Sequence, residues 1–217
     1  MLSPTALLIS SLTLVAAFKV PEGQANGVYR AYYNAEGQEV HELLTPEMLI
    51  SSPPEGAASV LQRSAPAAVA PGRFRRLTLL LVISFYCNTE LAPSSGGRRT
   101  GYDIYCGCGF TLDPGDCDAV VANLKAQFGS GYTFIQPRMS YYSIMGRSVV
   151  AFVCNYSGSA YLGVSAQTYG EWLIVITAEC GRYIAGSEGT PGSSSQGYMR
   201  SGSDFCANAL TSPAHHC

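Results

Sequence analysis

The sequence predicts an α+β fold: a two-layer sandwich in which an antiparallel sheet carries two helices on one face and disulfides staple the layers. Two segments in the C-terminal half have apolar residues at helical spacing, each with a cysteine on the apolar face. Runs rich in aromatic and β-branched residues, which favour strands, lie between and after these segments. All eight cysteines of the 217-residue chain follow residue 86, so the stapled domain is expected there.

The first helix is expected to begin at Asp113-Pro114-Gly115-Asp116. An aspartate can cap the first turn, a proline fits near the start, and acidic groups interact favourably with the positive end of the helix dipole. The apolar face that follows consists of Cys117, Val120, Val121, Leu124 and Phe128. Gly129 and Gly131 are expected to end this helix.

The second helix is predicted from a capping signal. Thr168 is followed three residues later by Glu171, which is the form of a capping box. The run from Trp172 to Cys180 also suits a strand, because it is rich in β-branched residues. The cap and the closing Gly181 favour a helix.

Four further segments are predicted as strands. Residues 132–142 and 148–156 are rich in aromatic and β-branched residues and are expected to form an antiparallel pair. Residues 183–185 and 197–200 are expected to be short strands that flank a Gly/Ser loop from Gly186 to Ser195.

The N-terminus predicts secretion. Residues 1–17 have the pattern of a signal peptide, with an apolar core from Ala6 to Val15 followed by small residues at the cleavage position. This apolar run is shorter than the roughly 20 residues that a membrane-spanning helix needs. A secreted chain folds in an oxidising compartment, so its cysteines are expected to form disulfides and to bind no metal.

Residues 18–99 are interpreted as a pro-region or linker. Residues 28–33 and 38–41 alternate around a turn and predict a small hairpin. The chain then becomes rich in Ala, Pro and Ser, a composition that buries too little apolar surface to fold. Two basic clusters end at Arg76 and Arg99 and resemble the sites cut by kexin-type processing proteases.

The domain is therefore expected to span residues 100–217. The apolar run from Leu77 to Cys87 has three interpretations: a buried strand, an apolar flap in the precursor, or translated non-coding sequence. Cleavage after Arg99 would remove Cys87 and leave an odd number of cysteines in the domain.

Eight cysteines allow 105 pairings, and the sequence does not choose among them. Cys117 and Cys180 lie on the apolar faces of the two helices and could meet if these pack side by side. Cys106 and Cys108 are too constrained to bond each other, so different partners are expected. Cys217 is expected to tie down the C-terminal tail. The predicted disulfide-bonded residues are Cys87, Cys106, Cys108, Cys117, Cys154, Cys180, Cys206 and Cys217.

Four motifs carry a resemblance to a known class of proteins. They are Cys106-Gly107-Cys108-Gly109, Asp116-Cys117-Asp118, the sequence from Val150 to Asn155, and the sequence from Cys180 to Gly186. With them, the segment from residue 100 to 217 resembles small cysteine-rich secreted proteins of filamentous fungi. It is similar to the necrosis-inducing-factor-like effectors and, in layout, to the α/β-sandwich killer toxins. The resemblance implies a role at the boundary between a fungus and its host or competitor, and supplies no catalytic residues.

The residues offer little for catalysis. Nucleophilic catalysis usually recruits a histidine, and the chain has His41 in the predicted pro-region and His215 and His216 at its end. A Ser-His-Asp or Cys-His arrangement is therefore not expected. Asp113, Asp116 and Asp118 could serve a glycosidase, but a cluster at a helix start more often caps the helix. No cofactor is expected.

Two classes of function follow. The first is a non-enzymatic secreted effector or toxin-like protein that acts on a host or microbial protein or glycan. The second is a secreted carbohydrate-binding module or hydrolase that uses the clustered carboxylates and exposed tyrosines; its candidate tyrosines are Tyr141, Tyr142, Tyr156, Tyr161, Tyr169 and Tyr183.

The net charge and a glycosylation sequon bear on the partners and the modification of the protein. The formal net charge of -2 gives no reason to expect nucleic acid as a partner, and no membrane anchor is expected. Asn155-Tyr156-Ser157 is a glycosylation sequon, which predicts a glycan on Asn155.

Overall fold

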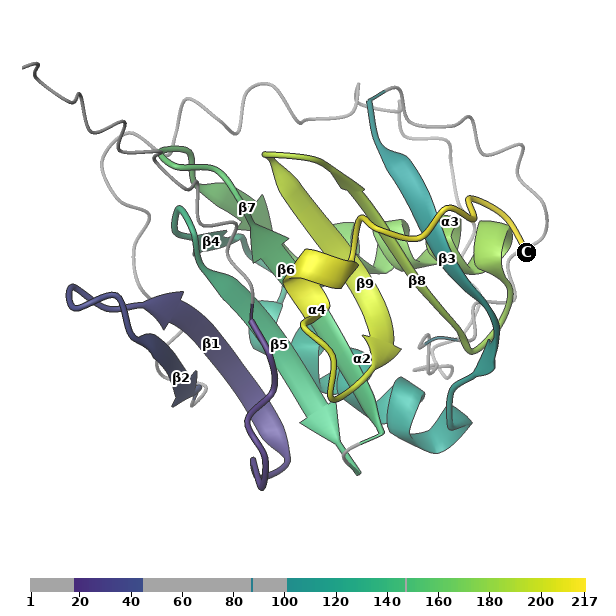
Figure 1. Cartoon of the computed structure of the whole chain (residues 1–217), viewed down its shortest axis with the longest axis horizontal. Helices are drawn as coiled ribbons and strands as arrows, with labels where there is room; N and C mark the ends of the chain where they lie inside the picture. The colour runs from purple at the N-terminus through teal and green to yellow at the C-terminus, as the bar shows by residue number, and fades with distance from the viewer. Residues whose placement is uncertain (1–17, 45–86, 88–100, 147) are drawn as a thin grey trace, which may run out of the picture.

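A computed structural model describes residues 18–44, 87, 101–146 and 148–217. Its main element is a seven-stranded antiparallel sheet in the order β2-β1-β5-β6-β9-β8-β3 (Figure 1). The strands of this sheet are β1 (Gly27–Tyr33), β2 (Glu39–Leu43), β3 (Asp103–Thr111), β5 (Ser140–Met145), β6 (Val149–Asn155), β8 (Ile184–Thr190) and β9 (Ser194–Arg200). The other elements are the helices α2 (Pro114–Phe128), α3 (Ala166–Cys180) and α4 (Phe205–Asn208), and the short strands β4 (Thr133–Ile135) and β7 (Leu162–Val164).

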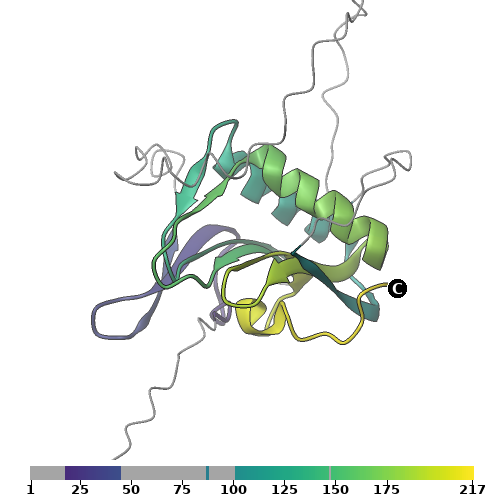
Figure 2. The same ribbon diagram turned by 90° about the horizontal axis from the view of Figure 1, so that it is seen from above.

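Helices α2 and α3 cover one face of the sheet, as Figure 2 shows. Their apolar faces and the facing side of the sheet form the main core. The opposite face carries α4, the N-terminal segment around Phe18 and a second apolar cluster. The predicted fold class, an antiparallel sheet with two helices on one face and disulfides, is confirmed.

Helix α2 forms as the sequence predicts. The Asp113 side chain caps it by accepting a hydrogen bond from the Asp116 amide, and the helix ends at Gly129 with φ at 64°. Its buried residues are Cys117, Val120, Val121, Leu124 and Phe128. Local signals suffice here, because capping and helical periodicity both act within a few residues.

Helix α3 is confirmed as a helix, but its predicted start is wrong. The capping box is formed by Ser165 and Thr168, one turn earlier than expected: the Ser165 hydroxyl accepts from the Thr168 amide, and the Thr168 hydroxyl accepts from the Ser165 amide. Glu171 lies within the helix, where it accepts a hydrogen bond from the Gln167 side chain. A threonine can therefore close the box from the third helical position, where the sequence rule expects Glu or Gln.

The predicted strand over residues 132–142 is two strands. β4 pairs with β7 in a separate two-stranded sheet, whereas β5 pairs with β6 in the main sheet. The break contains Pro137, which has no amide proton for a ladder, and Arg138, which has a left-handed backbone with φ at 56°. The expected antiparallel pairing with residues 148–156 is confirmed for β5.

The predicted Gly/Ser loop from Gly186 to Ser195 is wrong. Residues 184–190 and 194–200 are the paired strands β8 and β9, joined by a short turn. The glycines here allow close packing: a Cβ on Gly186 would lie 2.6 Å from Cγ2 of Ile176 in α3, and one on Gly197 would lie 2.2 Å from the Gly186 carbonyl oxygen. The glycines thus allow α3 to lie close to the sheet at Gly186 and the two strands to approach closely at Gly197.

The hairpin predicted in the pro-region is confirmed, and it belongs to the main sheet. β1 and β2 pair with each other, and β1 also pairs with β5 from Gly27 opposite Ile144 to Ala31 opposite Ser140. Residues 27–43 therefore share one sheet with the strands that follow residue 100, and the predicted division of the chain at residue 100 stays a prediction. Residues 1–17, the Ala/Pro/Ser-rich stretch, and Arg76 and Arg99 lie outside the described residues. In the described ranges no helix is long and apolar enough to cross a membrane.

Candidate functional site

The cysteines form four disulfides, which join the helices α2, α3 and α4, Cys87 and the C-terminal residue to one another or to the main sheet. The pairs are Cys87–Cys117, Cys106–Cys180, Cys108–Cys217 and Cys154–Cys206. Cys117 and Cys180 do not bond each other, because each faces a cysteine from outside the helix layer. The expectations that Cys106 and Cys108 have different partners, and that Cys217 ties down the tail, are confirmed.

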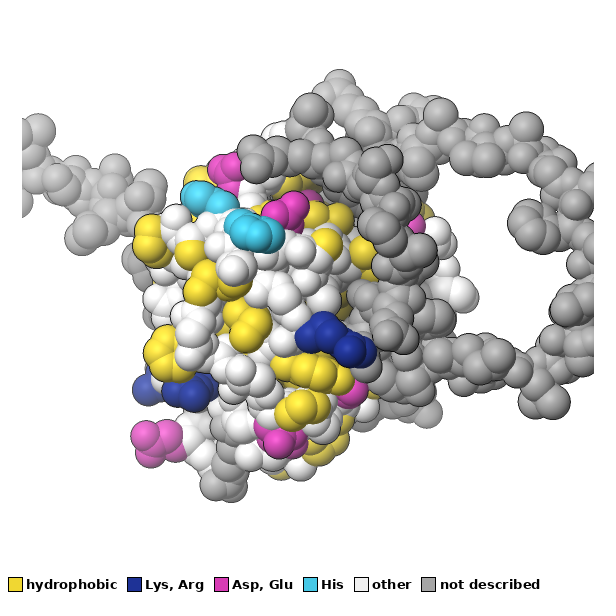
Figure 3. Space-filling model, turned by 90° about the vertical axis from the view of Figure 1, so that its right-hand side faces the viewer, with side chains coloured by type: hydrophobic (Ala, Val, Ile, Leu, Met, Phe, Trp, Pro, Cys, Tyr) yellow, Lys and Arg dark blue, Asp and Glu magenta, His cyan; other side chains and the backbone are white. Residues whose placement is uncertain are grey.

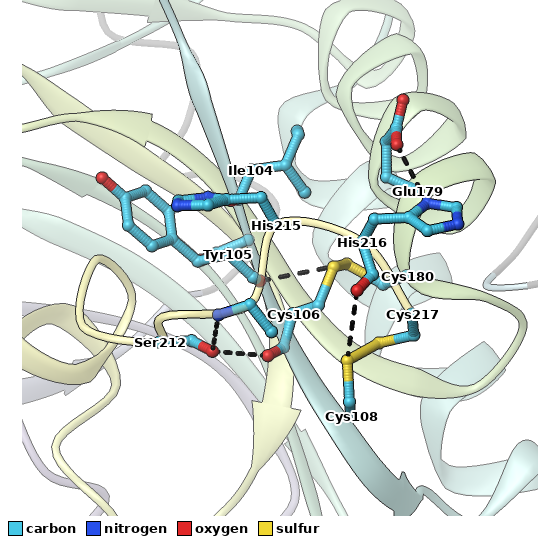
Figure 4. Close-up of a disulfide and its surroundings, with 12 residues drawn as sticks. Ile104, Tyr105, Cys106, Cys108, Glu179, Cys180, Ser212, His215, His216 and Cys217 are labelled. Atoms are coloured by element: carbon cyan, nitrogen blue, oxygen red, sulfur yellow. Dashed lines mark hydrogen bonds and ion pairs between the residues drawn. A yellow bond between two sulfur atoms is a disulfide. The ribbon is translucent and has the colours of Figure 1, made fainter.

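One disulfide differs from the other three in exposure. The six cysteines of the other pairs are at most 1% exposed. Cys108 and Cys217 are both exposed. The exposed pair joins the edge strand β3 to the last residue of the chain, and we define residues 212–217 together with this disulfide as the C-terminal clasp (Figure 4).

The tail of the C-terminal clasp runs along the outer edge of β3. The Cys106 amide donates to the Ala214 carbonyl at 2.7 Å, and the Cys106 carbonyl accepts from the Ser212 hydroxyl at 2.6 Å. The His215 ring nitrogen Nδ1 contacts the Ile104 carbonyl. The tail thereby binds the polar backbone groups of β3 that point away from β8.

The two terminal histidines lie on the surface of the clasp. His215 lies beside the Tyr105 ring, with ring centroids 5.4 Å apart, and His216 Nδ1 is 3.2 Å from Glu179 Oε2 at the end of α3. Figure 3 shows histidine and acidic side chains close together on this face of the molecule. Among the described residues, no group of three His, Cys, Asp or Glu side chains is placed to hold a metal ion.

The three carboxylates at the start of α2 have separate structural partners. Asp113 caps the helix, and Asp116 accepts a hydrogen bond from the Ser148 hydroxyl. Asp118 accepts from the Cys87 amide at 3.1 Å and from the Tyr183 hydroxyl at 3.4 Å, and burial raises its pKa. Asp118 therefore helps to fix the Cys87–Cys117 disulfide against α2. The capping role predicted for this cluster is confirmed for Asp113.

The six candidate tyrosines do not form an exposed stacking surface. Tyr141, Tyr142 and Tyr169 are at most 6% exposed and pack in the core. Tyr156 directs its hydroxyl to the Ser195 side chain and the Cys206 carbonyl, and burial raises its pKa. The two remaining members, Tyr161 and Tyr183, are half-buried.

Asn155, the predicted glycan acceptor, is buried in this fold, and glycosylation there stays a prediction. Asn155 lies at the end of β6 and is 2% exposed. Its Nδ2 donates to the carbonyl oxygens of Ile135, Gln136 and Ala160 at 2.9–3.0 Å, and its Oδ1 accepts from the Ser157 amide. A glycan on Nδ2 would displace these acceptors. The Asn155 side chain thus joins the end of β4 to the segments at Gln136 and Ala160.

Two polar clusters of the fold are not predicted by any motif in the sequence. His41 bridges from β2 to β5: its Nδ1 is 2.7 Å from the Tyr142 hydroxyl and its Nε2 is 2.6 Å from Glu39 Oε1. Glu188 and Gln196 face each other across β8 and β9 and are buried. A strand alternation through 188 and 196 would have been the signal for the second cluster, but the Gly/Ser-rich composition obscured it.

Two shallow depressions mark the described surface. One, of about 520 Å³, is lined by residues 19–24, Ile144, Ser201 and Gly202. The other, of about 220 Å³, lies beside Phe110, which is 59% exposed and has the Arg200 guanidinium 5.4 Å from its ring centroid. Neither depression brings two carboxylates together, which a glycosidase would need.

Comparisons with known proteins add no assignment. No protein-family model matches the chain, and neither a curated protein nor a solved structure matches it. Any functional conclusion therefore rests on the residues and geometry of the chain itself.

Proposed function

We propose that the protein is secreted and acts as a non-enzymatic effector or toxin-like protein on a host or competitor. The observation that carries the proposal is the disulfide framework. Its four bonds link β3 to α3, β6 to α4, Cys87 to α2 and the C-terminal residue to the sheet. Such cross-linking is typical of small proteins that work outside the cell, where thiols oxidise and proteases are present.

The structural roles of the candidate aspartates and tyrosines also support a non-enzymatic function. The clustered aspartates bind backbone amides and hydroxyls, and three of the candidate tyrosines are core residues. We therefore expect the protein to act by binding its target through its surface. The resemblance to fungal effectors and killer toxins, stated above from the motifs, gives the class of target: a host or microbial protein or glycan.

The mass of the secreted protein tests secretion and processing together. We expect no alkylatable thiol before reduction, because all eight cysteines are paired. If the chain is cut after Arg76 and Arg99, the peptide of residues 77–99 is expected to stay attached through Cys87–Cys117 and to separate only on reduction. Intact-mass spectrometry with and without reduction measures this. A secreted product that begins at Thr100 and carries a free thiol would contradict it.

The activity is tested by applying the purified protein to plant tissue and to fungal and bacterial cells. Native protein is expected to cause cell damage or growth inhibition in at least one of them, and reduced and alkylated protein is expected to cause none. The same preparations are assayed for glycoside hydrolysis and for retention on insoluble chitin, cellulose and glucan. Hydrolysis, or retention that is lost in Tyr132→Ala, would favour the second class, because Tyr132 is 49% exposed. Either result, without an effect on cells, would overturn the proposal.

A further inference from the structure

The edge of β3 is covered by the tail of its own chain. In an antiparallel sheet, an edge strand presents amide and carbonyl groups that can pair with another chain. On β3 the Cys106 amide, the Cys106 carbonyl and the Ile104 carbonyl are bound by Ala214, Ser212 and His215 in turn. The C-terminal clasp therefore occupies the place that an added strand would take.

Few contacts other than the disulfide hold the end of this tail. The Cys217 amide donates to the Glu179 carbonyl at 3.0 Å, and the His216–Glu179 pair is exposed. An exposed ion pair contributes little, because water screens it. The covalent bond between Cys108 and Cys217 is thus the main restraint on the last residues.

The exposure of Cys108 and Cys217 makes their disulfide easier for an external thiol to reach than the three buried ones. Thiol–disulfide exchange requires an external thiolate to approach one sulfur in line with the bond. The sulfurs of the other three pairs belong to residues that are at most 1% exposed, so a thiol reaches them only after the protein opens locally. Cys108 and Cys217 are exposed in the native fold.

We propose that Cys108–Cys217 is a thiol-reducible clasp whose selective opening frees the tail and uncovers the edge of β3. A thiolate of an external dithiol attacks one exposed sulfur, the Cys108–Cys217 bond breaks, and the departing sulfur takes a proton from water. The second thiol of the dithiol then attacks the mixed disulfide and releases the other cysteine. Two electrons pass from the dithiol, which becomes a cyclic disulfide, to the two cysteines.

The consequence is a change of surface without unfolding. The three buried disulfides still join the helices, α4 and the segment at residue 87 to the sheet, so the core stays intact. The tail loses its covalent end, and the Cys106 amide exchanges its bond to Ala214 for one to solvent. The clasp is expected to stay closed in an oxidising medium and to open in a reducing one. This inference does not depend on the proposed target.

Differential alkylation with dithiothreitol as the dithiol tests the order of opening. The native full-length protein is titrated with dithiothreitol, quenched with one alkylating reagent, then denatured, fully reduced and labelled with a second. Peptide mass spectrometry is expected to find Cys108 and Cys217 carrying the first label at a dithiothreitol concentration at least 10-fold below that for the other six. If a different pair opens first, or all four open together, the proposal is wrong.

Amide hydrogen exchange tests the uncovering of the edge. At the concentration that opens only the clasp, exchange at the Cys106 amide is expected to accelerate at least 10-fold, while core amides such as that of Phe152 keep their rates. Two variants complete the design: Cys108→Ser/Cys217→Ser is expected to show the fast rate without dithiothreitol, and Ser159→Ala, at an exposed serine outside the clasp, is expected to respond to dithiothreitol as wild type does. An unchanged Cys106 rate in protein whose Cys108 and Cys217 are alkylated would overturn the uncovering.

Discussion

A chain that begins at Leu77 is expected to be strongly destabilised, although it keeps all eight cysteines. It lacks β1, β2 and the segment around Phe18, so β5 becomes an edge strand and the apolar cluster on the outer face of the sheet loses part of its cover. Tyr29 stacks on Tyr142 with ring centroids 5.3 Å apart, and Tyr142 and Ile144 are at most 1% exposed in the intact chain. Exposing fully buried side chains of this size costs about 1.5–3 kcal/mol each.

Such a loss is large beside a net stability of about 5–15 kcal/mol for a whole domain. We therefore expect a drop in the free energy of unfolding of about 3 kcal/mol or more, seen as a low secreted yield and a lower melting temperature followed by near-ultraviolet circular dichroism. The reference is the chain that begins at Phe18, and Glu36→Ala at the exposed hairpin turn is the matched neutral variant. A peptide of residues 18–44 added in trans is expected to restore the signal. A truncated chain with the melting temperature of the reference would contradict the prediction.

Replacing Asn155 with aspartate is expected to destabilise the protein by about 3 kcal/mol or more. The amide group donates to three carbonyl oxygens, whereas an ionised carboxylate has no proton to donate and would face them with its negative charge. A buried group left without its partner costs about 1–3 kcal/mol, and more when it is charged. Thermal and urea unfolding of wild type and Asn155→Asp measure the loss.

Two controls separate this role from that of a glycan. Ser157→Ala destroys the sequon but removes only exposed hydrogen bonds to the Ser159 and Ala160 amides, so it is expected to stay within about 1 kcal/mol of wild type. Asn208→Ala changes an exposed asparagine and is expected to be neutral. If the secreted wild type carries a glycan on Asn155, or if Ser157→Ala is destabilised as much as Asn155→Asp, the hydrogen-bonding account fails.

The elements that can be predicted from the sequence are those whose signals lie within a few residues of one another. Asp113 and Gly129 bracket α2 because a cap and a terminal glycine act within one helical turn. The β1–β2 hairpin can be predicted in the same way, because its turn lies between two runs of alternating apolar and polar residues. In the start of α3, two overlapping capping patterns compete, and only the backbone geometry selects Ser165.

The features of the candidate site are harder to predict from the sequence. Exposure distinguishes Cys108–Cys217 from the buried disulfides, yet nothing in the spacing of the cysteines records it. The sequon at Asn155 is a three-residue pattern, whereas the carbonyl groups that the Asn155 side chain binds lie up to 20 residues away in the sequence. Local patterns cannot report which backbone groups meet after the chain folds.

The α+β class, both helices, the hairpin and the disulfide bonding of the cysteines can all be predicted from the amino-acid sequence. The pairing of β1 with β5, the bond of Cys117 to Cys87 and the position of the tail along β3 emerge only in the folded protein. These contacts join residues 30 to more than 100 positions apart. Many alternative pairings have similar local propensities. The packing of the whole core favours one of them, so these contacts are a property of the complete fold.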